Sequence, residues 1–158
     1  MSTPELPKDK LTDLDFEVFR EPWNKYGLKD GTSIKSRLIL HKVMLRQSFK
    51  MDGGVDKRAY GVENQIINVV YNVPDSLKTK PSTATYTPDE LEKAVVMDDI
   101  PYDTLAQEWN EYLVEDGTKI RFQLTLFRAA RTSLADKNGN PVYILQSGAT
   151  AAINPKKQ

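Results

Sequence analysis

One histidine and several carboxylates are the residues of this sequence whose side chains could support catalysis or metal binding. The chain contains a single histidine, His41, and no cysteine, which excludes disulfides, thiolate nucleophiles and cysteine-based metal sites. A histidine-centred metal site or a Ser-His-Asp arrangement would have to use His41. In the internal repeat described below, His41 corresponds to Phe127, so the position accepts a plain hydrophobic side chain. We therefore expect His41 to have a structural or surface role.

The carboxylates also have simpler explanations than catalysis. Asp30 and Asp116 could act as paired acids across a twofold axis, but each lies in an Asp-Gly turn that explains it. Asp98-Asp99 and the carboxylates of residues 89–92 could bind a divalent ion, yet they lack the ligand spacing of an EF-hand. The isolated glycines form no phosphate-binding or dinucleotide-binding pattern. The sequence predicts a non-enzymatic protein with no catalytic residue, cofactor or metal, and leaves open only carboxylate-based chemistry of an unknown class.

Basic side chains on two predicted strands are the candidate contacts for a partner or an anion. Lys35 aligns with Arg121 and Lys42 with Arg128, so basic character recurs at two equivalent positions. Phosphate contacts need Lys and Arg rather than a motif, which keeps nucleic acid open as a partner. These strands lack the interleaved aromatic residues of single-strand binders, and a solvated outer face is the plain alternative. The candidate set is Lys35, Arg37, Lys42, Arg46, Arg121 and Arg128.

Charge is balanced overall but not along the chain. The 22 basic and 22 acidic residues give a formal net charge of zero, so long-range attraction to nucleic acid or membrane is not expected. Residues 33–58 contain seven basic and two acidic residues. Residues 87–116 contain one basic and ten acidic residues, and residues 117–158 contain seven basic residues and one acidic residue. The acidic segment is therefore complementary to the basic strand faces. It could meet them within one chain or join neighbouring chains head to tail.

The elements that carry these residues occur twice. The 18 residues from Trp23 and the 18 residues from Trp109 share nine identities at an offset of 86. Downstream, Tyr60 aligns with Tyr143 and Pro74 with Pro155 at offsets smaller than 86, as expected where a loop between strands differs in length. The chain is therefore predicted to be a tandem duplication of a small, strand-rich unit.

The repeated residues predict β-hairpins and half-buried strands. Asp-Gly turns at 30–31 and 116–117, Asp52-Gly53-Gly54 and Asn138-Gly139 are hairpin signals. Apolar residues alternate from Ile120 to Leu126, as expected for a strand with one buried face. In the first copy the apolar set changes parity near His41, which predicts a bulge or bend there. Short strands are expected at residues 16–19, 59–63, 66–73, 142–146 and 149–153, while residues 103–113 have helical spacing and could be helix or strand.

The expected fold is mainly β, either all-β or α+β, with two small barrels or curled sheets of SH3-like or Sm-like size. Residues 13–74 form the first repeat, 75–98 a linker and 99–155 the second repeat, with tails at 1–12 and 156–158. Thr87-Pro88-Asp89-Glu90 is a capping-box start that predicts a helix over residues 88–97. Whether the repeats form one domain or two stays open.

Paired aromatic residues are candidates for packing between the repeats. Trp23 and Trp109 recur together with Tyr26 and Tyr112. Large aromatic side chains bury much area, so we expect these four residues to pack the copies against each other. An exposed stacking platform is the alternative for the two tryptophans.

These features favour a soluble, non-enzymatic interaction or assembly protein that self-associates through sheet edges and complementary charged faces. The expected partner is a protein, either a second copy or another chain. A nucleic-acid-binding module using the basic faces is the alternative. The start of the chain lacks the apolar stretch of a secretory signal, and no apolar run reaches the roughly 18 residues of a membrane span. With the absence of cysteine, this favours a cytoplasmic location.

Overall fold

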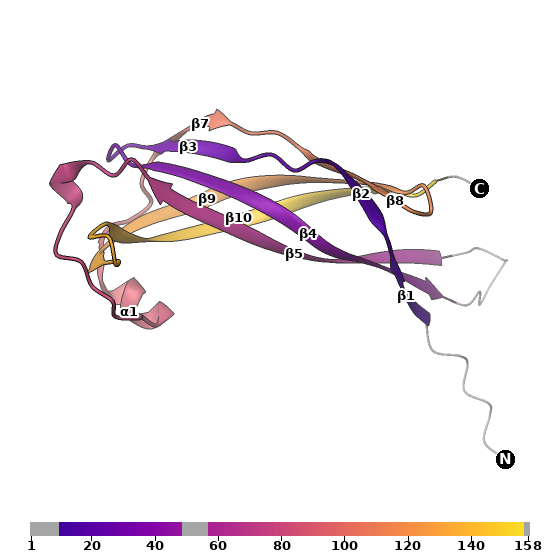
Figure 1. The fold of residues 1–158 in the computed structure, drawn as a ribbon, viewed down its shortest axis with the longest axis horizontal. Coiled ribbons are helices and arrows are strands. Elements are labelled where there is room, and N and C mark those ends of the chain that lie inside the picture. Colours follow the sequence, from indigo (N-terminus) through magenta and orange to yellow (C-terminus); the bar gives the residue numbers. More distant parts are fainter. Residues whose placement is uncertain (1–9, 49–56, 157–158) are drawn as a thin grey trace, which may run out of the picture.

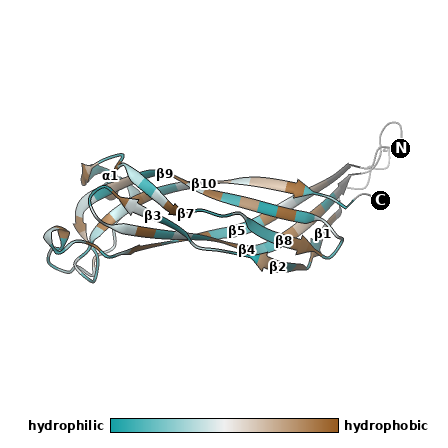
Figure 2. Ribbon diagram, turned by 90° about the horizontal axis from the view of Figure 1, so that it is seen from above, coloured by the Kyte–Doolittle hydropathy of each residue, from teal (hydrophilic) through white to brown (hydrophobic). Residues whose placement is uncertain are grey.

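Two antiparallel, five-stranded sheets pack face to face in an elongated body (Figure 1). The computed structural model describes residues 10–48 and 57–156. Apolar and polar residues alternate along the long strands (Figure 2), so each sheet has one face for the core and one for solvent. The prediction of a mainly β protein is confirmed.

The first sheet is built around one long central strand. β4 pairs with β5 along its whole length, while β3 and β1 pair with the start and the end of its other edge. β7 completes the sheet by pairing with β3. The strands are β1 (Lys10–Leu14), β3 (Asn24–Leu28), β4 (Ser33–Ser48), β5 (Lys57–Tyr71) and β7 (Tyr102–Ala106).

The second sheet has the same plan around another long strand. β9 pairs with β10 on one edge, and β8 and β6 pair with the start and the end of the other. β2 completes the sheet by pairing with β8. The strands are β2 (Phe16–Arg20), β6 (Val95–Met97), β8 (Asn110–Val114), β9 (Lys119–Ala135) and β10 (Pro141–Asn154).

The two sheets exchange a strand. β2 precedes β3 in the chain but pairs with β8, and β7 precedes β8 but pairs with β3. β2, β3 and β4 begin 86 residues before β7, β8 and β9. Residues 13–74 and 99–155, expected as the two repeats, therefore each contribute strands to both sheets.

The core lies between the sheets in two clusters, each with residues from both halves of the chain. One joins Leu38 and Val43 of β4 to Tyr112 of β8 and Phe122 of β9. The other joins Tyr26 of β3 to Leu126 of β9. The predicted inward residues of β9 are all buried, namely Ile120, Phe122, Leu124 and Leu126.

The predicted bulge at His41 is confirmed. Leu40 pairs with Asn64 and Lys42 with Glu63, so His41 is the extra residue in β4. A matching irregularity in β9 leaves Phe127 between the pairs that Leu126 and Arg128 form with Ser147 and Gln146. The bulges shift the side-chain parity of both long strands, which is why their apolar pattern changes register.

Open sheets replace the expected barrels. Among the described residues neither sheet closes on itself, because β5 and β10 each run as one long strand where two short ones were expected. Gly31 and Gly117 have φ of +94° and +87°, whereas Asp30 and Asp116 do not have positive φ. The hairpins that begin β4 and β9 therefore turn through a single left-handed glycine. The Asn138-Gly139 turn is also present, with Gly139 at φ +80°, and Asp52-Gly53-Gly54 lies outside the described residues.

Two further expectations about local structure need correction, and one alternative that the sequence left open is resolved. The linker helix α1 spans Pro88–Lys93 rather than 88–97, because Val95–Met97 pairs with β9 as β6. Thr87 does cap it, accepting a hydrogen bond from the Glu90 N–H. The tail expected at 1–12 overlaps β1, which pairs with the end of β4. Residues 103–113, for which the sequence left helix and strand open, lie in β7, β8 and the link between them, since pairing with β3 and β9 outweighs their helical spacing. A short 3-10 helix, η1, spans Asp75–Leu77 in the linker.

Candidate interaction surfaces

The basic residues at the start of β4 lie against aromatic rings on the outer face of the first sheet. The Lys35 ammonium lies 4.8 Å from the centre of the Trp23 ring and 5.7 Å from that of Tyr71. The Arg37 guanidinium lies 5.7 Å from the Trp23 ring and donates a hydrogen bond to the Glu21 carbonyl oxygen. Trp23, which precedes β3, and Tyr71 of β5 therefore supply the aromatic rings that the sequence of β4 lacks.

Most of the other predicted basic residues have intramolecular carboxylate partners. Lys42 lies 3.5 Å from Asp13, and Arg121 lies 3.7 Å from Glu111 with its guanidinium 4.5 Å from the centre of the Trp109 ring. Arg46 is exposed and, within the described residues, forms no ion pair. The predicted set therefore forms no continuous free basic surface.

Arg128 makes the most extensive of these contacts. Its guanidinium donates to both carboxylate oxygens of Glu92, at 2.6 and 3.0 Å, and to both of Asp98, at 3.0 and 3.2 Å. Hydrogen bonds from Arg128 are the main reason that the pKa values of Glu92 and Asp98 lie below their usual range. Part of the acidic segment thus meets the basic strand face within one chain, where it holds α1 against β9.

The four residues predicted to pack the repeats divide into two pairs. Tyr26 and Tyr112 are buried, one in each core cluster. Trp23 and Trp109 are partly exposed and lie beside Lys35 and Arg121 on the outer faces. The tyrosines therefore occupy the expected packing position, whereas the tryptophans stack with cations.

Two asparagines next to the tryptophans make reciprocal contacts between the halves. The Asn24 side-chain amide donates to the Leu124 carbonyl of β9, and that of Asn110 donates to the Leu38 carbonyl of β4. Leu38 and Leu124 are themselves 86 residues apart. Each asparagine therefore satisfies a strand carbonyl in the other half of the chain, a long-range contact that no local sequence pattern indicates.

The aspartates of the Asp-Gly turns also bind the opposite half of the chain. Asp30 accepts a 2.6 Å hydrogen bond from the Tyr143 hydroxyl, and Asp116 accepts one of the same length from the Tyr60 hydroxyl. Burial would raise the pKa of Asp30, but hydrogen bonds from Tyr143, the Thr32 N–H and Arg131 outweigh it, so the pKa lies below its usual value. The two aspartates lie at opposite ends of the body, where they could not act as a catalytic pair.

Strand edges provide the longest accessible backbone. Among the described residues, β5 and β10 each pair with one strand only, which leaves one edge of each unpaired. None of the 14 residues of β10 is charged, and β5 is uncharged from Asn64 to Tyr71. Charges, Pro and bulges are the usual protection of a sheet edge. β10 has Pro141 at its first residue and two register irregularities against β9, but it has no charged side chain along its length.

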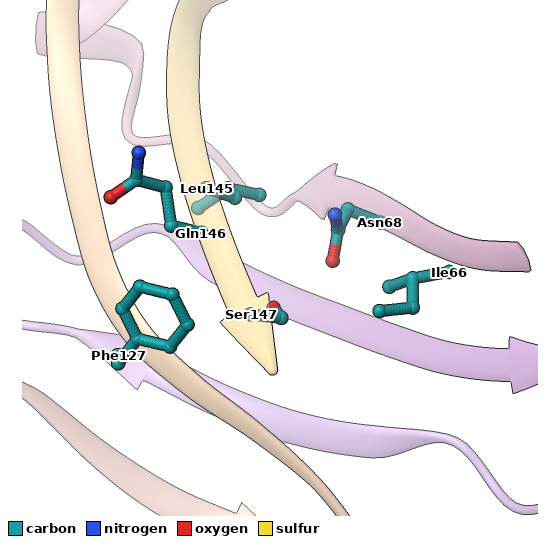
Figure 3. A pocket seen from close by; sticks show the side chains of 6 residues that line it. All are labelled: Ile66, Asn68, Phe127, Leu145, Gln146 and Ser147. Carbon is teal, nitrogen blue, oxygen red and sulfur yellow. The ribbon is translucent and has the colours of Figure 1, made fainter. Parts of the chain in front are cut away.

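A groove of 390 Å³ lies between these two strands (Figure 3). Its apolar lining comes from Ile66 of β5, Leu145 of β10 and Phe127 of β9, the last with 60% of its surface exposed. Within the described part of the chain, the Ser147 hydroxyl in its wall is buried without a hydrogen-bond partner. Asn68 and Gln146 complete the lining, so the groove combines apolar contacts with polar groups that could receive a partner's backbone.

Residues 10–48 and 57–156 contain no group of three His, Cys, Asp or Glu side chains that could hold a metal ion. His41 is exposed, and its ring nitrogen lies 3.2 Å from the Gln65 side-chain oxygen. No helix in these ranges has the length and apolar character required to cross a membrane. Comparison of the chain with family models, with curated proteins and with solved structures finds no match.

Proposed function

We propose that this chain is a duplicated β unit that serves as a non-enzymatic assembly protein, and that a second copy pairs with the free edge of β10. The duplication is supported by the reciprocal contacts of Asn24 with Leu124 and of Asn110 with Leu38. It is also supported by the exchange of β2 and β7 between the sheets. In this proposal the halves are strand-exchanged copies within one sandwich rather than separate barrels.

The observation that carries the assembly function is the uncharged, 14-residue edge of β10. Strand addition gains affinity from main-chain hydrogen bonds and specificity from pockets for alternate side chains. Two copies of β10 can meet in antiparallel orientation about a twofold axis without opposing like charges. The adjoining groove, with Phe127 and Leu145, offers apolar surface to the side chains of the added strand.

Charge complementarity, in contrast, contributes less to this proposal than the sequence pattern suggested. Within one chain, Glu92 and Asp98 already form ion pairs with Arg128, and Asp13 forms one with Lys42. Association through β10 should therefore persist in salt, because backbone hydrogen bonds and apolar contacts are not screened as exposed charges are.

Sedimentation velocity of the full chain over a range of protein and salt concentrations tests this function. We expect a reversible dimer whose population changes little between low and high salt. Ala149→Lys with Ala151→Lys should abolish dimerisation, since both side chains are exposed on β10 and would place like charges opposite each other. Thr125→Lys, on the exposed face of β9, is the matched control and should dimerise normally. A wild-type chain that stays monomeric throughout would refute the proposal.

A nucleic-acid-binding function is the second candidate, because Lys35 lies beside the rings of Trp23 and Tyr71 on an outer face. Aromatic rings next to cations can stack bases and contact phosphates. Fluorescence anisotropy with mixed DNA and RNA at low salt tests it, with the Lys35→Gln, Arg37→Gln variant as the comparison. The absence of binding at low salt, where counterion release favours it most, excludes this candidate.

A further inference from the structure

One cross-strand position carries opposite charges on the second sheet and like charges on the first. In the second sheet, Glu111 of β8 lies opposite Arg121 of β9, and the two side chains form an ion pair at 3.7 Å. In the first sheet, the equivalent residues are Lys25 of β3 and Lys35 of β4, which also lie opposite each other. Like charges directly opposite each other on adjacent strands destabilise a sheet. The lysine pair therefore lowers the stability of the first sheet where the second sheet gains from an ion pair.

No carboxylate among the described residues neutralises this pair. Neither Lys25 nor Lys35 forms an ion pair there. The Lys35 ammonium lies near the uncharged rings of Trp23 and Tyr71. Lys25 is exposed and Lys35 is partly exposed. The outer face of the first sheet thus presents two neighbouring cations that an external anion can reach.

The lysine pair lies far from Lys10 and Ser48, where the first described range begins and ends. Lys35 is about 40 Å along β4 from Gln47, the residue that pairs with Lys10. Nine residues, the length of the segment before Lys10, span at most about 32 Å. Residues 49–56 begin farther away still. These parts of the chain cannot cover the lysine pair, which is therefore accessible to a partner.

The surface around the lysines is aliphatic on the first sheet and more polar on the second. On the outer face of the first sheet, Val69 of β5 lies opposite Lys35, and Ile67 lies opposite Arg37. Ile39 of β4 continues this face, and all three aliphatic side chains are partly exposed. The residues at the equivalent positions of the second sheet are Ala152, Thr150 and Thr125. The first sheet therefore combines free cations with aliphatic surface, which its counterpart does not.

We propose that the outer face of the first sheet binds a protein segment that carries both acidic and aliphatic side chains. A carboxylate of this partner lies between Lys25 and Lys35. Its aliphatic side chains cover Ile39, Ile67 and Val69.

Charge and surface chemistry select this partner over two others. Bases stack on aromatic rings rather than on aliphatic side chains, so the aliphatic surface favours a protein over nucleic acid. A second copy that presented the same face would set lysines against lysines, which disfavours a symmetric dimer here. The inference is independent of the proposed function, because association through β10 uses a strand edge rather than this face.

Replacing one lysine by its counterpart from the second sheet tests the charge argument. Lys25→Glu restores the acidic residue found at Glu111 and should raise the melting temperature by about 1–4 °C. Lys119→Glu makes the same charge change at an exposed position of β9 whose cross-strand neighbours, Leu113 and Asn154, are uncharged. This control should not raise the melting temperature. A Lys25→Glu chain no more stable than the control would overturn the proposal.

Titration of the ¹⁵N-labelled full chain with a blocked peptide, Glu-Thr-Val-Thr-Ile-Thr-Glu, tests binding. In an extended peptide, its acidic and aliphatic side chains share one face. We expect amide shifts at Lys25, Lys35 and Val69 and none at Thr125 or Thr150. A peptide with Gln in place of Glu should bind at least about tenfold more weakly.

Variants and a second probe show which groups are responsible. Lys25→Glu should weaken peptide binding at least about tenfold. Ile67→Thr with Val69→Ala should weaken it several-fold without unfolding the chain, because the second sheet has the same residues at these positions. Lys119→Glu should bind like wild type. Tighter binding of mixed-sequence DNA than of the peptide would assign this face to nucleic acid and overturn the proposal. Shifts confined to β10, or no shifts at all, would also overturn it.

Discussion

The two ends of this sandwich have matching interiors and different outer surfaces. At one end Asp30 binds Tyr143, and at the other Asp116 binds Tyr60, each through a 2.6 Å hydrogen bond. On the outer faces, Arg128 binds two carboxylates of the α1 region, whereas the equivalent Lys42 has one carboxylate partner, Asp13, among the described residues. An interior residue must fit both halves at once, but an outer residue need fit only the segment that covers it. The interior contacts are therefore similar in the two halves, and the outer contacts differ.

The largest loss of stability is expected when Tyr26 or Tyr112, the most deeply buried tyrosine of each core cluster, is truncated. Tyr26→Ala and Tyr112→Ala should each lower the free energy of unfolding by about 3–5 kcal/mol, because each leaves a cavity in a core cluster. Since both clusters contain residues of both halves, denaturant unfolding of either variant should remain a single transition. Two separated transitions, or a loss below about 1 kcal/mol, would show that the halves are energetically independent.

The reciprocal asparagines allow a finer comparison. Asn110→Ala removes the side-chain donor of the Leu38 carbonyl and should cost about 1–3 kcal/mol. Asn24→Ala should cost less, because the Gln107 side chain also donates to the Leu124 carbonyl, at 3.0 Å. Urea unfolding of both variants and of the Asn24→Ala, Gln107→Ala double variant checks the order. Equal costs for the single variants would mean that Gln107 does not substitute for Asn24.

The Asp30 cluster should give stability that depends on pH. The pKa of Asp30 is lower in the folded protein than its usual value, so ionised Asp30 stabilises the fold above the unfolded pKa of about 4. This contribution should disappear as the pH falls through the lower, folded pKa. Burial, with the contact to Asp30, raises the pKa of Tyr143 to about 12, so the hydroxyl stays protonated at neutral pH. Asp30→Asn should therefore be less stable than wild type at pH 7, with the difference narrowing below about pH 4 in denaturant titrations. A constant difference would assign the effect to packing alone.

Substitutions of charged residues on the outer faces should change stability least. Arg128→Gln should leave the melting temperature nearly unchanged and speed amide hydrogen exchange in α1 and at Ser133, whose N–H donates to the Ala94 carbonyl. Lys42→Gln should leave both measurements at wild-type values, since its single contact with Asp13 is exposed. High salt should reproduce part of the Arg128→Gln effect. Unchanged exchange in α1 would mean that its apolar contacts alone hold it.

Sequence patterns predicted the bulge at His41 and the start of α1, because neighbouring residues alone determine both features. The parity change near His41 identified the bulge, since side-chain direction in a strand follows the residue count. The Thr87 capping box located the start of α1 for the same reason, but not its end, which pairing of β6 with β9 determines. Of the candidate surfaces, the sequence named the basic residues and predicted association through sheet edges, but it did not indicate which strands have a free edge. It did not identify the partners of Arg128 or the rings beside Lys35, because those contacts join residues distant in sequence.

By itself, the sequence determined the repeated segments, the inward faces of the long strands and the glycines of the turns. Each of these follows from neighbouring residues and a fixed period. Only the tertiary structure decided that β2 and β7 exchange sheets, that residues 103–113 form strands and that Asn24 and Asn110 reach across the core. Two similar halves present equivalent surfaces, so either arrangement of β2 and β7 would satisfy the same alternating pattern. The alternating pattern of one strand shows which of its faces is buried, but it does not show which other strand pairs with its edge. Strand pairing therefore depends on the tertiary arrangement and could not be predicted from the pattern.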